Sequence, residues 1–356
     1  MEYDVIHFEA LGEEAKYLEQ ETRECKKKGL LPANFKYLIT PENVQTYLLY
    51  HKHFILPDLI TTKTHSILPE EYLVGKKKSV VTRSAGYDHF EHLQSIINLA
   101  SLREYCVNAV AQTAIKFLYA ACGRMNEYMK NTASFERNHT TSFMELGKNR
   151  IATVFGVGKI GKKIYELLEQ NDLTVQAVDI REQELKRVYG DSVKFVSKEE
   201  ALLTSDILIN AMNLTKNPKS KFYNMNYFSE KEFSLVKKGV IFINVTRGEI
   251  APESILLNCY KKGIISGIGL DVFTNEEVFS KVVKGEMKTQ EKDIKAAKKI
   301  EEKALSQEEN FYVQPHQAFN SDLAARAKAK EAMKQICIWY KNNKEKFDEQ
   351  LPYYCD

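Results

Sequence analysis

Short apolar runs alternate with amphipathic stretches along the whole chain. The runs at residues 5–8, 35–39 and 79–82 are rich in β-branched and aromatic side chains, which predicts strands. Further strands are predicted at 151–155, 174–178, 193–196, 207–210, 240–244, 264–270 and 311–313. Several of these runs are almost continuously apolar, which is typical of parallel strands covered on both faces. The pattern therefore predicts an α/β fold.

Helical signals separate the apolar runs. The stretch after the first strand ends at Lys26-Lys27-Lys28-Gly29, and basic residues followed by glycine are typical of a helix C-terminus. Thr40-Pro41 indicates an N-cap followed by proline at the first helical position. Residues 108–129 are alanine-rich and apolar nearly all round, which predicts one buried helix. Lys and Glu interleave over 280–309, which predicts a solvated helix with i,i+4 ion pairs.

A glycine-rich turn follows the strand at 151–155. Gly156, Gly158 and Gly161 fit the pattern G-x-G-x-x-G and precede a predicted helix at 159–169. In a dinucleotide-binding unit these glycines permit the tight turn, the approach of the pyrophosphate and close helix–strand packing. Free N–H groups at the helix N-terminus favour the anion. The turn in this context predicts a dinucleotide site.

An acidic residue ends the next strand. A carboxylate at Asp179 would bind the adenosine ribose hydroxyls and repel a 2′-phosphate, which favours NAD over NADP. Arg181 could accommodate a phosphate in part, so some use of NADP stays open.

Three strands are predicted before the glycine turn, so they cannot belong to its first βαβ unit. They predict a separate N-terminal domain. A last helix is predicted at 321–340, after the nucleotide sheet is complete, and it would return to that first domain. We expect a substrate domain at 1–107, completed by 318–356, and an NAD-binding domain at 108–317.

Composition narrows the class of protein. The chain has 356 residues and a net charge of +3, which gives no reason to expect a nucleic-acid or membrane partner. No apolar run has the length of a membrane span. Residues 1–8 carry acids where a signal peptide carries Lys or Arg, and the six cysteines form no Cys-x-x-Cys pair, so we expect a cytoplasmic protein. His51 and His53 lack further spaced ligands, so no metal site is expected.

Three charged residues then stand in contexts that suit catalysis. Arg247 follows an apolar strand, where an arginine can grip a small carboxylate with two parallel hydrogen bonds. His316 follows the strand at 311–313, and a histidine there can donate a proton to a carbonyl oxygen. Glu276 could orient the imidazole and favour its protonated form.

These residues carry a resemblance to a known family. Arg247, Leu270-Asp271-Val272-Phe273, Glu276 and Pro315-His316 resemble the D-isomer-specific 2-hydroxyacid dehydrogenases over essentially the whole chain. Residues 82–89, Thr-Arg-Ser-Ala-Gly-Tyr-Asp-His, are similar to the substrate loop of the D-lactate dehydrogenase branch. The resemblance implies two Rossmann-like domains, a flavodoxin-like substrate domain and a doubly wound NAD-binding domain, with a cleft between them.

The resemblance also implies roles. His316 would be the acid/base, Glu276 its partner, and Arg247 the residue that binds the substrate carboxylate. Backbone N–H groups of Ala85 and Gly86 would help Arg247, and Tyr105 and Phe319 would line the substrate pocket. The implied cofactor contacts are Gly156, Gly158, Lys159, Ile160, Gly161, Asp179, Ile180, Asn213, Val245, Thr246, Arg247, Asp271 and His316. The family is typically homodimeric.

Some positions depart from the family pattern. Glu277 stands where a proline usually follows the glutamate, so it competes with Glu276 for the partner role, although the spacing from Asp271 favours Glu276. Cys106-Val107 replaces Ser-Pro, and the segment from Glu276 to His316 is longer than usual.

The expected activity is the reversible, NADH-dependent reduction of pyruvate or a related small 2-oxo acid to the D-hydroxy acid. One alternative is a reductase for glyoxylate, hydroxypyruvate or bulkier branched or aromatic 2-oxo acids. A second alternative is a protein that senses NAD without catalysis, similar to the C-terminal-binding corepressors.

Overall fold

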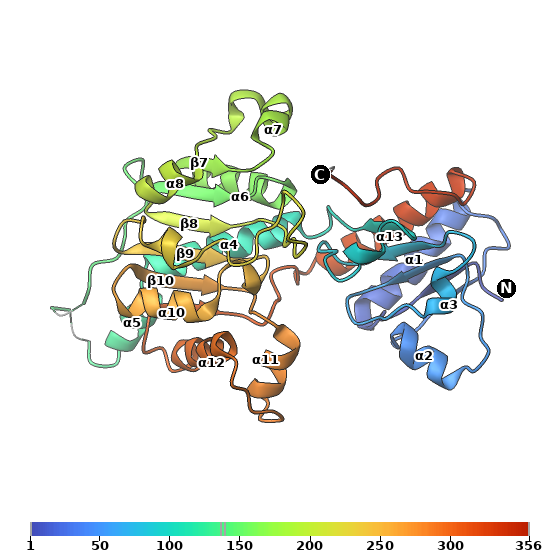
Figure 1. Cartoon of the computed structure of the whole chain (residues 1–356), viewed down its shortest axis with the longest axis horizontal. Helices are drawn as coiled ribbons and strands as arrows, with labels where there is room; N and C mark the ends of the chain where they lie inside the picture. The colour runs from blue at the N-terminus through green and yellow to red at the C-terminus, as the bar shows by residue number, and fades with distance from the viewer. Residues whose placement is uncertain (1, 136, 139, 355–356) are drawn as a thin grey trace. The chain divides into compact units, whose positions relative to one another are not determined.

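The computed structural model describes residues 2–135, 137–138 and 140–354, and the chain forms two compact units (Figure 1). Unit 1 comprises residues 1–106 and 320–356, and unit 2 comprises Val107–Phe319. Each unit is built on a parallel sheet, so the predicted α/β class with two such units is confirmed.

The sheet of unit 1 has five parallel strands in the order β2-β1-β3-β4-β5. Their bounds are β1 Val5–His7, β2 Tyr37–Ile39, β3 Leu59–Thr62, β4 Ser79–Thr82 and β5 Asn98–Ser101. This is the flavodoxin-like order, in which the chain reverses direction across the sheet between β1 and β3. Ligands of such sheets bind beyond the carboxyl ends of the strands, at that reversal.

Both faces of this sheet are covered. Val5 and Leu59 belong to a core with helices α1 (Gly12–Lys27) and α13 (Ala324–Lys341), which pack side by side. The next residues, Ile6 and Ile60, point to the other face and pack with α2 (Val44–Tyr50) and α3 (Glu70–Leu73). Alternate side chains are therefore buried on opposite faces, which explains the unbroken apolar runs.

The start of α2 differs from the prediction. Thr40 still belongs to the end of the β1–β2 pair, since its N–H donates to His7 O at 2.9 Å and its carbonyl accepts from Ala10 N at 2.9 Å. The helix begins instead at Val44, where the Asn43 side chain accepts from Thr46 N at 2.9 Å. The predicted N-cap at Thr40-Pro41 was wrong because these sheet contacts hold Thr40 outside the helix.

The sheet of unit 2 has six parallel strands in the order β11-β10-β9-β8-β6-β7. Their bounds are β6 Ile151–Phe155, β7 Thr174–Val178, β8 Ile207–Asn210, β9 Val240–Asn244, β10 Ile265–Leu270 and β11 Phe311–Val313. The strand predicted at 193–196 is reduced to a single bridge between Phe195 and Ala177. The order reverses between β6 and β8, which is where a doubly wound sheet binds its nucleotide.

Helices cover both faces of the second sheet. Helices α4 (Val107–Cys122) and α6 (Lys159–Gln170) pack together, α4 against β9 and β10 and α6 against β6 and β7. The opposite face is covered by α8 (Lys198–Thr204), α9 (Glu230–Phe233) and α10 (Glu253–Lys261). The remaining helices are α5 Met125–Asn131, α7 Glu182–Tyr189, α11 Glu276–Val283 and α12 Lys292–Leu305.

The helix predicted at 108–129 is broken into α4 and α5. Arg124 lies in the left-handed region at φ 48°, which no helix interior adopts. The side-chain amide of Asn126 then donates to the carbonyls of Glu309 and Phe311, at 3.0 and 3.1 Å. These hydrogen bonds hold α5 against the residues before and at the start of β11, so α5 does not continue α4.

The charged segment at 280–309 is also two helices rather than one solvated helix. An i,i+4 ion pair does form within it, between Lys298 and Glu302 at 3.7 Å. However, α12 buries Ile294, Ala297 and Ile300 against the core that includes α10. These apolar residues recur at helical spacing among the Lys and Glu residues. That spacing indicates a helix with a buried face, and the sequence analysis overlooked it.

Within the described ranges, no helix combines the length and the apolar character needed to cross a membrane.

The cysteines that the structure describes are free thiols, namely Cys25, Cys106, Cys122, Cys259 and Cys337. Cys355 lies outside the described residues.

Two glycines in β10 allow α4 to pack directly on the strand. A Cβ at Gly269 would lie 2.6 Å from Phe117 Cβ, and one at Gly267 would lie 3.2 Å from Ala121 Cβ, both in α4. We expect Gly269→Ala to lower the free energy of unfolding by about 1–3 kcal/mol through overpacking, measured by denaturant unfolding. Gly147→Ala, where the nearest atom is the Asn149 side-chain oxygen at 3.2 Å, should leave it nearly unchanged. Equal stability of the two variants would contradict this close packing.

Candidate active site

The glycine turn lies at the end of β6, beside the residues that follow β8. Gly156 has φ 85°, and a Cβ there would lie 2.8 Å from Met212 Cα. A Cβ at Gly161 would lie 1.8 Å from Gly156 O, so this glycine permits the helix to pack on the turn. A Cβ at Gly158 would have no atom within 4 Å. The middle glycine therefore faces open space, as a turn that admits a pyrophosphate requires.

Asp179 follows β7 and is held in place by backbone groups. Its carboxylate accepts hydrogen bonds from Val157 N at 2.8 Å and Arg181 N at 2.9 Å. The Arg181 guanidinium pairs with Asp179 (Nε to Oδ1 3.6 Å) and with Glu184 (Nη1 to Oε1 3.7 Å). Two carboxylates next to this arginine disfavour a 2′-phosphate there. The glycine turn and Asp179 thus fit NAD, which would be held by these residues.

The other residues predicted for the cofactor lie at the same edge of the sheet. Lys159 and Ile160 begin α6, and Ile180 is an exposed residue directly after Asp179. Asn213 follows β8, and its carbonyl accepts from Asn224 Nδ2 at 2.7 Å. Val245 and Thr246 follow β9; the Thr246 hydroxyl accepts from Asn210 Nδ2 at 2.8 Å.

Glu276 and His316 are joined by a short hydrogen bond. The distance from His316 Nδ1 to Glu276 Oε2 is 2.7 Å. The second oxygen of the carboxylate, Oε1, accepts from Phe273 N at 3.1 Å, which fixes its orientation. Both side chains are partly exposed. A carboxylate on Nδ1 leaves Nε2 as the ring nitrogen that can exchange a proton with a ligand.

The backbone around His316 is shaped by Asp271. His316 has φ 51°, and its N–H donates to Asp271 O at 2.7 Å. The Asp271 carboxylate accepts from Gln314 Nε2 at 2.7 Å, Gln317 N at 2.8 Å and Ala318 N at 3.0 Å. Burial raises the pKa of this carboxyl, and the hydrogen bond from Gln314 opposes the shift. Asp271 therefore holds the turn that presents His316.

Glu277 points elsewhere. It forms an ion pair with Lys281 at 2.7 Å, and its side chain is 81% exposed. Of the two neighbouring acids, Glu276 is the one that contacts the imidazole.

Arg247 lies in the turn after β9, close to the loop that carries Glu276. Its carbonyl accepts from Asn244 Nδ2 at 2.8 Å, and its guanidinium Nη1 donates to Thr246 O at 2.8 Å. A Cβ on the next residue, Gly248, would lie 2.1 Å from both Phe273 C and Thr274 N. The Arg247 turn and the loop before α11 are thus in direct backbone contact.

The residues predicted to bind substrate fall in both units. Phe319 lies in unit 2, its ring 6.5 Å from that of His316 at an edge-on angle of 72°. Ala85 and Gly86 lie in unit 1 after β4, where the Ser84 hydroxyl donates to Gly86 O at 2.9 Å. Tyr105 is also in unit 1, and its N–H donates to the Glu331 carboxylate at 2.8 Å.

Some site residues were missed in the sequence. Asn244 and Gln314 support Arg247 and Asp271, and both are polar residues at the ends of apolar strands, a signal that could have found them. Glu253 is 1% exposed and accepts from Thr274 N at 2.8 Å, beneath the loop that carries Glu276. Its position at the start of α10 looks like an ordinary helix N-terminus and gave no sign of burial.

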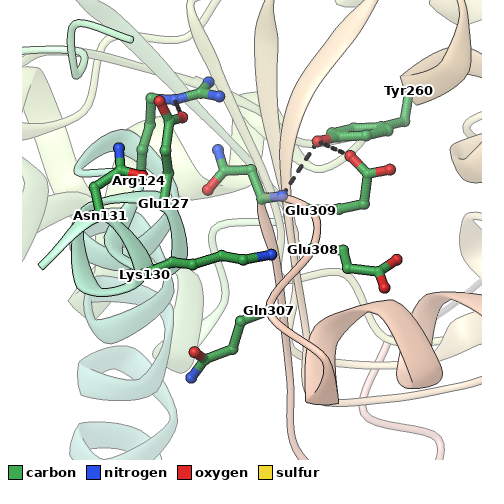
Figure 2. Close-up of a pocket in the computed structure, with 9 residues that line it drawn as sticks. Arg124, Glu127, Lys130, Asn131, Tyr260, Gln307, Glu308 and Glu309 are labelled. Atoms are coloured by element: carbon green, nitrogen blue, oxygen red, sulfur yellow. Dashed lines mark hydrogen bonds and ion pairs between the residues drawn. The ribbon is translucent and has the colours of Figure 1, made fainter. Parts of the chain in front are cut away.

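A polar cavity of about 190 Å³ lies at the other end of the same sheet (Figure 2). Its lining includes Arg124, Glu127, Tyr260 and Asn310. Asn310 directly precedes β11, whereas His316 follows it, so this cavity and the His316 turn are at opposite edges. None of the residues predicted for the site lines it.

The fold of unit 2 and its glycine turn define a dinucleotide-binding α/β unit. Residues 115–318 match the family model described as D-isomer specific 2-hydroxyacid dehydrogenase, NAD binding domain. The chain belongs to this family, which confirms the resemblance seen in the motifs and NAD as the cofactor.

The individual relatives have low sequence identity to this chain. Erythronate-4-phosphate dehydrogenase of Bacteroides fragilis is 26% identical, and the match covers 64% of this chain and 61% of that protein. Glyoxylate reductase of Thermococcus gammatolerans is 27% identical, with 73% and 81% covered. Among solved structures, this chain is similar to D-lactate dehydrogenase from Aquifex aeolicus, which was solved in complex with NAD and lactic acid. The match has a TM-score of 0.76 at 22% identity, and it covers 99% of this chain and 100% of that chain. At that identity the last match shows a shared fold.

Burial of Glu253 makes stability depend on pH. Burial is the largest cause that raises the pKa of this carboxyl from 4.5 to about 7. Between pH 4.5 and about pH 7, Glu253 keeps its proton in the folded chain but releases it in the unfolded chain. The free energy of unfolding therefore declines as the pH rises through this range. Glu253→Gln keeps an oxygen acceptor for Thr274 N and removes the charge. We expect the variant to melt several degrees above the parent at pH 8 and close to it at pH 5.

The measurement is thermal unfolding at both pH values, with Glu286→Gln, an exposed position, as control. The control should melt like the parent at each pH. A Glu253→Gln variant with the same melting difference at pH 5 and pH 8 would contradict the shifted pKa.

Proposed function

We propose that the protein is an NAD-dependent D-2-hydroxyacid dehydrogenase that reversibly reduces pyruvate or a related small 2-oxo acid. The observation that supports this most is the hydrogen bond of 2.7 Å between His316 Nδ1 and Glu276 Oε2. It gives the histidine an acidic partner on one nitrogen and leaves the other for proton transfer. The family match and relatives that are reductases and dehydrogenases support the same reaction class.

Arg247 binds the substrate carboxylate in this proposal. A guanidinium offers two parallel N–H donors to a carboxylate, which fixes the keto carbon in one orientation. The backbone N–H groups of Ala85 and Gly86 assist, and the rings of Tyr105 and Phe319 line the pocket. Unit 1 supplies the substrate loop, and unit 2 supplies the cofactor and the proton donor.

His316 transfers the proton. When bound, NADH supplies the hydride to the keto carbon. His316 Nε2 gives its proton to the oxygen as negative charge develops there, and in the reverse direction removes it. Glu276 fixes the orientation of the ring through Nδ1, and the Asp271 carboxylate keeps the turn that carries the ring in place. The product is the D-hydroxy acid.

The resemblance also supports a homodimer, and the free cysteines support a reducing compartment such as the cytoplasm.

A panel of 2-oxo acids tests the function. NADH absorbance would be followed with pyruvate, glyoxylate, hydroxypyruvate, phenylpyruvate and 2-oxoisocaproate. Preference for pyruvate supports the proposal, whereas preference for another member identifies the alternative reductase. Tight NADH binding without turnover on any 2-oxo acid would favour an NAD-sensing protein.

Replacing the proton donor should remove turnover. In His316→Ala we expect kcat to fall by roughly 10²–10⁴-fold because general acid catalysis is lost. NADH affinity, measured by fluorescence titration, should stay close to that of the parent. Turnover near that of the parent would rule out His316 as the acid.

Replacing Arg247 should affect both substrate binding and turnover. Lysine keeps the charge but cannot form the fork of two hydrogen bonds. In Arg247→Lys we therefore expect a large rise in KM for the 2-oxo acid together with a lower kcat. Steady-state kinetics measures both, and an unchanged KM would show that the carboxylate is bound elsewhere.

A further inference from the structure

Unit 2 contains a buried carboxyl group that binds one of the loops of the candidate site. Glu253 lies in the first turn of α10 and is 1% exposed. Its Oε1 accepts the Thr274 N–H at 2.8 Å, in the loop between β10 and α11. An acid in the first turn of a helix commonly stays beside the N–H groups of that helix. The Glu253 side chain instead supports another segment.

The N-terminus of α10 receives an acceptor from α12, which packs beside it (Figure 1). Ser254 N donates to Asp293 Oδ1 at 3.3 Å. Asp293 is also a charged side chain that acts on Glu253, and its negative charge raises the pKa of the Glu253 carboxyl. Within the described part of the chain, Glu253 Oε2 is buried and forms no direct hydrogen bond. These surroundings offer little that would stabilise a negative charge on Glu253.

Two acidic side chains bind neighbouring peptide groups of the same loop. Glu253 Oε1 accepts from Thr274 N at 2.8 Å. Glu276 Oε1 accepts from the preceding N–H, that of Phe273, at 3.1 Å. The other oxygen of Glu276 contacts His316 Nδ1 at 2.7 Å. The position of these two peptide groups therefore determines where Glu276 holds the imidazole.

The same peptide groups also contact the turn that carries Arg247. A Cβ at Gly248 would lie 2.1 Å from Phe273 C and from Thr274 N, so no side chain separates the two backbones. The chain continues from this turn into α10, where Glu253 binds Thr274 N. The turn and the loop are thus held together at two points, Gly248 and Glu253.

We propose that Glu253, with its proton bound, is a positioning residue that holds the loop carrying Glu276 against the turn carrying Arg247. This rests on the proposed function and adds a residue to its machinery. Glu253 acts through the Thr274 N–H on the contact between Glu276 and His316. Loss of the proton places a charge in a buried site, and the loop loosens because water must reach that charge.

The burial of Glu253 determines at which pH this happens. Burial is the largest cause that raises the pKa of Glu253 to about 7, and the hydrogen bond from Thr274 N opposes the rise. The carboxyl group is therefore neutral below this pH and becomes charged as the pH rises through it. The loop is consequently held best on the acid side of this range.

Two substitutions separate the hydrogen bond from the charge. Glu253→Ala removes the acceptor for Thr274 N, so we expect kcat at pH 6 to fall by roughly tenfold, with a smaller change in KM. Glu253→Gln keeps an oxygen acceptor and stays neutral, so its kcat at pH 6 should be close to that of the parent. Each kcat is expressed per NADH-binding site from fluorescence titration, which corrects for unfolded protein. Glu230→Gln, an exposed acid in the first turn of α9, is the control and should match the parent.

The pH profile tests the charge. It is measured in the direction of oxidation, with NAD and the D-hydroxy acid that corresponds to the best 2-oxo acid. His316 accepts the proton in this direction and must be neutral, so a rising pH does not disable it. We expect kcat of the parent to fall by roughly threefold or more between pH 7 and pH 9, and Glu253→Gln to lack this decline.

Hydrogen exchange measures the loop without any turnover. With the full-length protein at pH 6, mass spectrometry would follow a peptide that covers residues 271–279. The peptide should exchange faster in Glu253→Ala than in the parent, because the Thr274 N–H loses its acceptor. In Glu253→Gln its exchange should match the parent.

The outcomes keep this inference apart from the function itself. Parent-like kcat in Glu253→Ala, or an alkaline decline in Glu253→Gln equal to that of the parent, overturns the positioning role while dehydrogenase activity stands. If Glu253→Ala does not fold, the pH profile of Glu253→Gln decides alone. No turnover of any 2-oxo acid by the parent overturns the proposed function instead. Faster exchange in Glu253→Ala would then still support the hold on the loop, and equal exchange would overturn it.

Discussion

The carboxylate of Asp271 organises the candidate site. Asp271 directly follows β10 and is 1% exposed, and its carboxylate accepts hydrogen bonds from the side chain of Gln314 and from the backbone of the two residues after His316. Its own carbonyl receives the His316 N–H. A buried carboxylate leaves water only if donors replace its hydration, so these segments are held in one arrangement. The position of the imidazole thus follows from satisfying a buried charge, and the contact with Glu276 follows from that position.

Unit 1 has a comparable centre in the Arg83–Glu14 pair, but with a different balance. Around Asp271, neutral donors from Gln314, Gln317 and Ala318 form the hydrogen bonds to the carboxylate. Around Glu14, both carboxylate oxygens form ion pairs, one with Arg83 at 2.8 Å and the other with Lys63 at 2.6 Å. The two units therefore satisfy their buried carboxylates differently, with neutral donors at Asp271 and with basic side chains at Glu14.

Much of this organisation could be predicted from the sequence, because short-range patterns determine it. The strand at 240–244 is apolar on both faces, and Gly156 and Gly161 lie where a Cβ would meet neighbouring atoms at 2.8 and 1.8 Å. The errors have a common physical cause. Thr40 was misread because contacts with His7 and Ala10 decide its conformation, and the break at Arg124 depends on bonds from Asn126 to residues near β11. The burial of Lys328 likewise results from its packing in unit 1, which no local pattern reveals.

The route of the chain through the two units has a consequence for synthesis. Unit 2 is one continuous segment, Val107–Phe319, whereas the core of unit 1 includes Met333, Ile336 and Trp339 from α13. Trp339 also donates to the Ser79 hydroxyl in β4 at 2.8 Å. A chain emerging from the ribosome can complete unit 2 as soon as that segment is released. Residues 1–106 must wait for α13, so a segment made before unit 2 becomes native after it.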